Sequence, residues 1–224
     1  DFIYNKDKLK INNTYFRNKD LSFKNESLII LEPFLDANLK FSVEDINTQI
    51  FKKLDIEEIL ASKNIIKKIN SKNEINFKSK KLSRNLIDDL NLKVDLAYGR
   101  ANYNKKIIIS KSFFECKGNI NFLEEYPLLF FDCAIISENK KNLLKKFSIK
   151  IKDKQKSFKL FFNGSLNILN KKINFDNINL NKNYQASKED LEYFENTFKN
   201  IIFNETFIKI FDYDKIKKFI LEIT

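Results

Sequence analysis

Residues 90–98 read Leu-Asn-Leu-Lys-Val-Asp-Leu-Ala-Tyr, a stretch in which apolar side chains occupy almost every second position. Side chains alternate between the two faces of a β-strand, so this pattern predicts a strand with one apolar and one polar face. The apolar face receives Leu90, Leu92, Val94 and Leu96. The polar face receives Asn91, Lys93 and Asp95. A one-residue error in this register would exchange the two faces.

The same alternation recurs along much of the chain. It is found for Leu39, Phe41 and Val43, for Phe147, Ile149 and Ile151, and for Phe158, Leu160 and Phe162, continuing through Gly164 to Leu166 and Ile168. Phe161 interrupts the polar side of the last row, and we expect it to lie partly exposed or under a loop. Successive strands of this kind predict an elongated, curved antiparallel β-sheet, a β-groove, with one continuous apolar face. A second sheet, a helix or lipid would cover that face.

The chain is predicted to be mainly β, with one internal helix. Asp55 and Glu58 form a capping-box pattern ahead of apolar residues at helical spacing, which predicts a helix over residues 55–69. A short helical turn is expected at residues 142–146. No segment rich in Pro, Gly or Ser divides the chain, so residues 1–224 are predicted to form a single domain. Strands are expected at residues 8–16, 21–23, 27–32, 38–43, 74–79, 87–98, 106–116, 118–122, 128–137, 147–152, 157–169 and 172–180.

The pattern changes at residue 184, and residues 184–224 are predicted to form a helical end cap. Ser187 and Asp190 mark the start of an amphipathic helix. The apolar face of this helix receives Leu191, Phe194, Phe198 and Ile201. A second amphipathic helix is expected to begin near Asp212 or Asp214. We interpret both helices as a cover over the end of the sheet, and a gate or docking element at the end of a groove is the alternative.

The composition argues against most catalytic and metal-binding chemistry. The chain has no His, and its three Gly residues lie too far apart for a G-x-G-x-x-G or G-x-x-x-x-G-K motif. Two Cys without His cannot supply the four ligands of a structural zinc site. Acidic residues are scattered among lysines, as on a solvated face, although a carboxylate pair could still support glycosidase chemistry. We therefore predict a protein that is not an enzyme, with no metal and no cofactor.

The formal net charge is +11, from 41 Lys and Arg residues and 30 Asp and Glu residues. Arg occurs only at Arg17, Arg84 and Arg100, and the abundance of Lys, Asn, Ile and Phe is typical of an A+T-rich genome. Because nucleic-acid-binding proteins rely on Arg for bidentate contacts, we predict no specific nucleic-acid partner. A diffuse positive surface suits an anionic membrane surface instead. An anion-binding or nucleic-acid-binding basic protein is kept as a further alternative.

Five stretches carry a resemblance to a known family. They are GSLNILNKKINF at residues 164–175, GNINF at 118–122 followed by YPLLFFD at 126–132, and SKEDLEYF at 187–194 with the ending KKFILE at 217–222. With these stretches, residues 75–224 resemble the C-terminal part of the AsmA-like family. That family consists of Gram-negative envelope proteins related to bridge-like lipid-transfer proteins.

The resemblance implies a hydrophobic β-groove that takes part in phospholipid transport between the inner and outer membrane, or in outer-membrane assembly. Phospholipid acyl chains would contact the apolar rows, and other envelope proteins are candidate partners. The family implies a periplasmic location and no catalytic residues. The absence of Met suggests a segment of a longer protein, and no apolar run in the sequence is long enough to span a membrane. The resemblance implies that the longer protein is anchored in the inner membrane by a helix upstream of Asp1. A lipid-free β-scaffold or periplasmic assembly factor is the alternative, and it predicts the same alternation.

The two cysteines suit a periplasmic setting. If residues 122–127 close a hairpin, strand counting places Cys116 opposite Cys133. Neighbouring strands offer the Cβ separation of roughly 3.5–4.5 Å that a disulfide requires. Two buried free thiols that fill small core sites are the other interpretation, and it is the one we favour.

Overall fold

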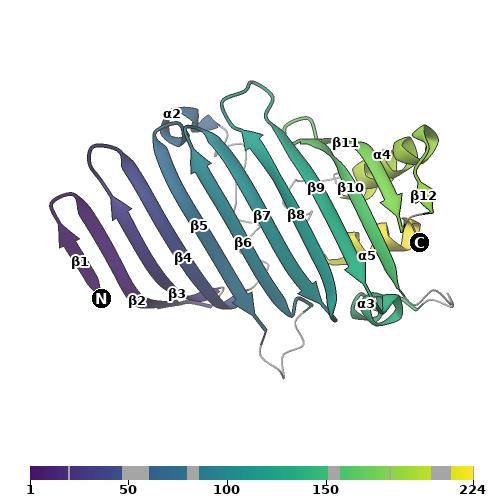
Figure 1. Cartoon of the computed structure of the whole chain (residues 1–224), viewed down its shortest axis with the longest axis horizontal. Helices are drawn as coiled ribbons and strands as arrows, with labels where there is room; N and C mark the ends of the chain where they lie inside the picture. Colours follow the sequence, from purple (N-terminus) through teal and green to yellow (C-terminus); the bar gives the residue numbers. More distant parts are fainter. Residues whose placement is uncertain are drawn as a thin grey trace.

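The computed structural model describes residues 1–19, 21–46, 61–79, 86–150, 157–181, 183–202 and 213–223. Within these ranges, 12 strands form one long, open, curved sheet in which the spatial order follows the chain order from β1 to β12 (Figure 1). The strands are β1 (Phe2–Asn5), β2 (Lys8–Arg17), β3 (Leu21–Ile30), β4 (Leu35–Ile46), β5 (Ile69–Lys78), β6 (Asp89–Ala97), β7 (Arg100–Ile109), β8 (Ser112–Asn121), β9 (Leu128–Ser137), β10 (Phe158–Asn167), β11 (Lys172–Leu180) and β12 (Tyr184–Gln185). The predicted mainly β fold is confirmed.

The sheet is mixed, because β4 and β5 run parallel while the other neighbouring strands pair antiparallel. The prediction of a purely antiparallel sheet is therefore wrong at this one pair. Parallel neighbours need a long crossover connection, and 22 residues separate Ile46 from Ile69. The short helix α2 (Lys63–Ile66) lies in this connection. It covers part of the predicted internal helix, whereas Ile69 begins β5, and residues 55–60 lie outside the described ranges.

Two tight turns shape the centre of the sheet. Tyr98 and Gly99 both have positive φ, 51° and 77°, and connect β6 to β7 as a two-residue hairpin. Ser110 and Lys111 also have positive φ, 49° and 64°, and connect β7 to β8. The sequence prediction ran one strand through residues 106–116 and placed a turn at 99–102, so it missed this second hairpin. Neither Ser nor Lys carries the Gly or Asn signal on which turn prediction relies.

The predicted strand at residues 147–152 is wrong where the structure describes it. Asn139 is the N-cap of helix α3 (Lys140–Lys146), and its side chain accepts a hydrogen bond from the Asn142 N–H at 2.9 Å. Phe147 ends this helix, Ser148 has a φ of 56°, and Ile149 follows without strand pairing. Phe147 and Ile149 are both buried beside the end of this helix. Their spacing in the sequence therefore resembles that of a strand, although they do not form one. Ile151 lies outside the described ranges.

Smaller differences concern the strand ends. β1 was not predicted, and β3 is continuous where two short strands were expected. Ile168 lies in the turn between β10 and β11 rather than on a strand. The expected C-terminal helices are present as α4 (Lys188–Ile202) and α5 (Tyr213–Ile223).

Helix α4 begins where the sequence predicted. The Ser187 N–H donates to Asp190 Oδ2 at 2.9 Å, and the Asp190 N–H donates to Ser187 Oγ at 3.2 Å. The Tyr184 hydroxyl donates a third hydrogen bond to Asp190 Oδ2 at 2.8 Å. These hydrogen bonds lower the pKa of the Asp190 carboxyl, so the capping carboxylate stays ionised.

Candidate functional site

One face of the sheet is apolar from β2 to β11. Directly paired residues share a face, so the register can be followed from strand to strand. One such row crosses the sheet through Phe41, Ile75, Leu92, Lys105, Cys116, Cys133, Phe162 and Ile178. A parallel row runs through Val43, Phe77, Leu90, Ile107, Phe114, Ile135 and Leu160. We call this surface the apolar face.

The strand residues proposed from sequence as the apolar rows lie on this face. Partly buried side chains are contributed by Leu39, Phe41, Val43, Leu90, Leu92, Val94, Leu96, Phe158, Leu160 and Phe162. Leu166 is buried. The side chain of Lys93 points to the other face and is 60% exposed, so the register of β6 is as predicted. Phe161, on the polar face, is 41% exposed, as expected.

Helices α3 and α5 cover the apolar face at one end of its central strands. Ile109 of β7 is buried with four residues of the α3 segment, Leu143, Leu144, Phe147 and Ile149. Ile216 and Ile220 of α5 pack against this cluster. The Tyr213 hydroxyl donates to the Lys146 carbonyl at 3.1 Å, and the Tyr213 ring stacks on Phe147. Phe147 and Ile149 therefore belong to a helix-capped core and not to a strand row.

Helix α4 covers the apolar face over β10 and β11. Phe198 packs against the buried pair Leu166 and Ile173, and its ring meets Phe219 of α5 edge to face at 5.5 Å. A register shift in β11 leaves the Phe175 N–H free to donate to Glu195 of α4 at 2.8 Å. Of the other residues predicted for the end cap, Ile201 is buried, and Leu191 and Phe194 are partly buried.

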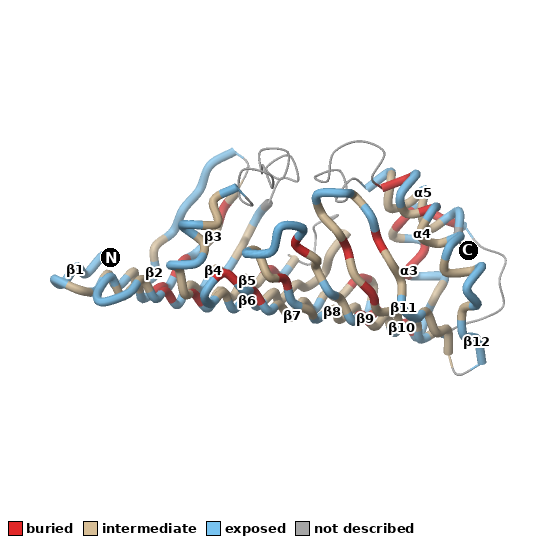
Figure 2. Tube along the Cα trace, turned by 90° about the horizontal axis from the view of Figure 1, so that it is seen from above, coloured by how far each residue is buried: buried red, intermediate tan, exposed pale blue. Residues whose placement is uncertain are grey.

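The described helices thus cover only part of the apolar face. Figure 2 shows α3, α4 and α5 standing above the end of the sheet that carries β9–β11. Within the described ranges, the buried apolar clusters draw on β7–β11 and not on β2–β6. Many apolar side chains of β2–β6 are partly exposed, with Phe16 at 43%, whereas Ala37 of β4 and Phe77 of β5 are buried on the same face. We call the apolar face of β2–β6 the open strip.

Polar residues on the apolar face are few and mostly hydrogen-bonded to one another. The Asn25 amide donates to the Lys40 carbonyl at 3.2 Å, and the Ser27 hydroxyl donates to Asn25 at 3.1 Å. The Asn73 amide donates to Ser71 at 2.9 Å and to the Val94 carbonyl at 3.0 Å. These groups are neutral, and their hydrogen bonds offset the cost of burying them.

Cys116 and Cys133 face each other across β8 and β9, as strand counting predicted. Their Cα atoms are 4.1 Å apart, and the two sulfurs form a disulfide. The favoured interpretation as two free thiols is therefore corrected. The disulfide lies on the apolar face beside Lys105.

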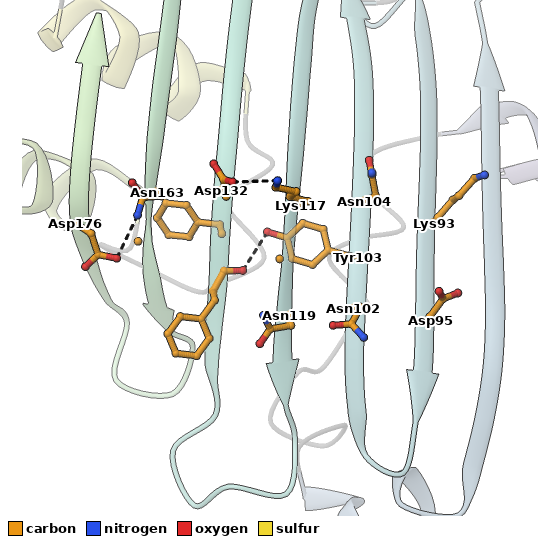
Figure 3. A pocket seen from close by; sticks show the side chains of 14 residues that line it. Lys93, Asp95, Asn102, Tyr103, Asn104, Lys117, Asn119, Asp132, Asn163 and Asp176 are labelled. Atoms are coloured by element: carbon orange, nitrogen blue, oxygen red, sulfur yellow. Dashed lines mark hydrogen bonds and ion pairs between the residues drawn. The ribbon is translucent and has the colours of Figure 1, made fainter. Parts of the chain in front are cut away.

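The opposite face carries the charges in alternating signs. Lys106 pairs with Glu115 at 3.2 Å, and Lys117 pairs with Asp132 at 3.3 Å across neighbouring strands. A shallow hollow of about 810 Å³ lies over β6–β11, lined by polar groups that include Lys93, Asn102, Asn119 and Asp176 (Figure 3). Its charged pairs are exposed and already matched, which is typical of a solvated face.

Two polar residues of the apolar face were not singled out from the sequence. Burial raises the pKa of Tyr103 to about 12, and its hydroxyl lies 3.4 Å from the Phe130 carbonyl oxygen, to which it donates. Burial also lowers the pKa of the Lys105 ammonium. The β6 alternation, extended by one hairpin, places residues 101, 103, 105 and 107 on the apolar face. This extension was missed because the predicted turn at 99–102 lost the register.

In the described part of the chain, no helix combines the length and apolar character that crossing a bilayer requires. Across the same ranges, no three His, Cys, Asp or Glu side chains gather in a cluster suited to a metal ion. Comparisons with family models, with curated proteins and with solved structures found no match.

Proposed function

We propose that this protein is a non-enzymatic segment of a periplasmic envelope protein whose apolar face contacts phospholipid acyl chains. It takes part in moving phospholipid between the inner and outer membrane or in outer-membrane assembly. The observation that supports this proposal is the continuous apolar face, whose described helical cover lies over β7–β11 while the open strip lies on β2–β6. Exposed apolar area costs roughly 25 cal/mol per Å², and acyl chains would remove that cost.

Two further observations fit a conduit. The strip crosses several strands without a charged side chain, so a chain lying on it meets only apolar and neutral groups. The disulfide fits an oxidising compartment such as the periplasm. The proposed partners are therefore phospholipid acyl chains, with an anionic membrane surface as a looser contact for a chain of net charge +11.

Site-specific photo-crosslinking tests this proposal. A benzophenone amino acid replaces Leu92 or Val94 on the apolar face, and Asn91 or Lys93 on the polar face serves as the matched control. The protein is incubated with vesicles of phosphatidylethanolamine and phosphatidylglycerol, irradiated and examined by mass spectrometry. We expect lipid adducts at residues 92 and 94 and none at 91 and 93. Equal labelling of both faces, or none at either, would contradict the proposal.

A lipid-free assembly factor is the second candidate, and one observation favours it. Phe113, Ile136 and Phe161 lie near one another on the polar face and are 38%, 37% and 41% exposed. Single exposed apolar residues are ordinary, whereas a group on a charged face suits contact with another protein. The same crosslinker at Phe113 distinguishes the two functions: protein adducts there, with no lipid adducts at residue 92, would favour the assembly factor.

A further inference from the structure

Lys105 occupies an unusual place in the sheet. It pairs directly with Leu92 on β6 and with Cys116 on β8, and its same-face neighbours on β7 are Tyr103 and Ile107. The strand register therefore places its side chain on the apolar face. In the described strands β2–β11, it is the sole Lys, Arg, Asp or Glu on this face.

The ammonium of Lys105 has no partner among the described residues. The groups that face it are Leu92, the disulfide sulfur of Cys116 and the neutral phenol of Tyr103, which already donates to Phe130. The neutral polar residues of the same face, Asn25 and Asn73, are hydrogen-bonded. Desolvation by these surroundings lowers the pKa of Lys105, because burial disfavours the charged ammonium. A charge in such a place is stabilised by an opposite charge brought by a ligand.

The open strip begins next to Lys105. From Lys105 the register leads across Leu92 and Ile75 to Phe41. Three strand spacings of about 4.8 Å make this row roughly 14 Å long. The hydrocarbon core of a bilayer is about 30 Å thick, so one acyl chain spans about half of that. Lys105 stands within the longer row that continues to Ile178, and it borders the part of that row that belongs to the open strip. A cation at this border matches an amphiphile with an anionic head and a single chain on the strip.

We infer that Lys105 binds the anionic group of a long-chain amphiphile whose acyl chain lies over Leu92, Ile75 and Phe41. The shared chemistry is a phosphate or carboxylate joined to an alkyl chain, as in a phospholipid or a fatty acid. This inference rests on the proposed function, because it assumes that the open strip accepts acyl chains. Beyond the proposed function, Lys105 would make the strip selective for a negatively charged head group and would fix the position of that head group on the sheet.

Calorimetric titration with four probes tests the inference. Dodecyl phosphate and dodecanoate carry the two anionic heads, dodecanol carries the same chain without charge, and inorganic phosphate carries the charge without the chain. We expect the parent protein to bind each anionic amphiphile about tenfold more tightly than dodecanol. A ratio between the two anionic probes identifies the preferred head. Inorganic phosphate alone is expected to bind far more weakly than dodecyl phosphate.

The test variant is Lys105→Gln, and the matched control is Lys106→Gln. Lys106 is the next residue, on the opposite face, and is paired with Glu115 at 3.2 Å. Lys105→Gln is expected to lose the preference for anionic heads and to keep its affinity for dodecanol, while Lys106→Gln keeps both. Circular dichroism and a thermal melt show whether each variant folds. Lys105→Met serves as a second variant, which retains an apolar core without the charge.

The outcomes separate the two proposals. If the parent binds dodecanol and dodecyl phosphate equally well, Lys105 is not an anchor, although acyl chains still bind. If Lys105→Gln keeps the anionic preference, the inference is likewise wrong. If inorganic phosphate binds as tightly as dodecyl phosphate, Lys105 belongs to a simple anion site. If no alkyl probe binds the parent, acyl chains do not bind the open strip, and both the proposed function and this inference are wrong.

Discussion

Gly118 of β8 lies where the sheet leaves no room for a side chain. A Cβ at this position would overlap the carbonyl oxygen of Phe130 and lie 2.8 Å from Cε1 of Tyr103. Gly164 of β10 is placed likewise, and both pair with Phe131. Glycine within a strand allows close approach of a neighbouring backbone. The ring of Phe131 therefore has a glycine on each side.

We predict that Gly118→Ala lowers the free energy of unfolding by about 1–3 kcal/mol, because the new methyl group meets backbone that cannot move aside easily. The urea midpoint measures this loss. Asn119→Ala is the matched control, since Asn119 is the next residue and is exposed on the polar face. The control is expected to change stability by less than about 0.5 kcal/mol. Equal midpoints for the two variants would show that the strands have more room at Gly118 than the structure indicates.

Helix α4 is stabilised by hydrogen bonds at its N-terminus and by packing of its apolar side against the sheet. Its first turn is held by the reciprocal Ser187 and Asp190 hydrogen bonds. Its apolar side reaches the sheet through Phe198, and Glu195 accepts the hydrogen bond from β11. Short helices in water depend on such tertiary packing more than on their own propensity. The helix is therefore expected to be stable only while it lies on the sheet.

We predict that Phe198→Asp destabilises the protein by about 2–4 kcal/mol, because it removes aromatic packing and places a charge in an apolar cluster. Asn196→Asp introduces the same charge on the exposed side of the same helix and is expected to be nearly neutral. Urea unfolding followed by circular dichroism compares the two. A Phe198→Asp midpoint equal to that of Asn196→Asp, with rapid proteolysis of residues 188–202 in the parent, would identify α4 as a docking arm rather than an end cap.

Packing is uneven along the length of the molecule. Ile109 and its neighbours, and the Leu166–Ile173 pair, form the buried apolar clusters of the described residues, and both lie between β7 and β11. At the other end, all four residues of β1 are exposed, and the β2 pattern contains no buried residue. Local stability follows the number of buried apolar contacts, so the two ends of one sheet are expected to differ.

We predict that amide hydrogen exchange is fast in β1 and β2 and slow in β8–β10, with the rate falling along the sheet. Mass spectrometry of peptic fragments measures this gradient. Added phospholipid vesicles are expected to slow exchange in β2–β6 selectively, because acyl chains would lie there. In the control, a dialysis membrane separates the vesicles from the protein, so that phospholipid cannot reach it. A uniform exchange rate along the sheet would contradict the gradient.

Local patterns were sufficient for much of the secondary structure. The alternation around Leu92 predicted the faces of β6, and Ser187 with the following apolar stripe predicted α4. These features depend on neighbours along the chain, so they can be recognised from the sequence before the fold is known. Ser110 and Lys111 form a hairpin turn without the Gly or Asn that positive φ favours, and their positive φ values are held by the pairing of β7 with β8. That pairing joins residues on two strands, which no local pattern reports.

The candidate site divides in the same way. Side-chain alternation alone determined that one face would be apolar, because it follows from strand geometry. Which part of that face is covered depended on where α3, α4 and α5 dock, and Phe147 turned out to belong to the cover. The place of Lys105 also depended on the register beyond the Tyr98–Gly99 hairpin. Coverage and register are set by contacts between residues far apart in sequence, and only the tertiary structure decides which of them form.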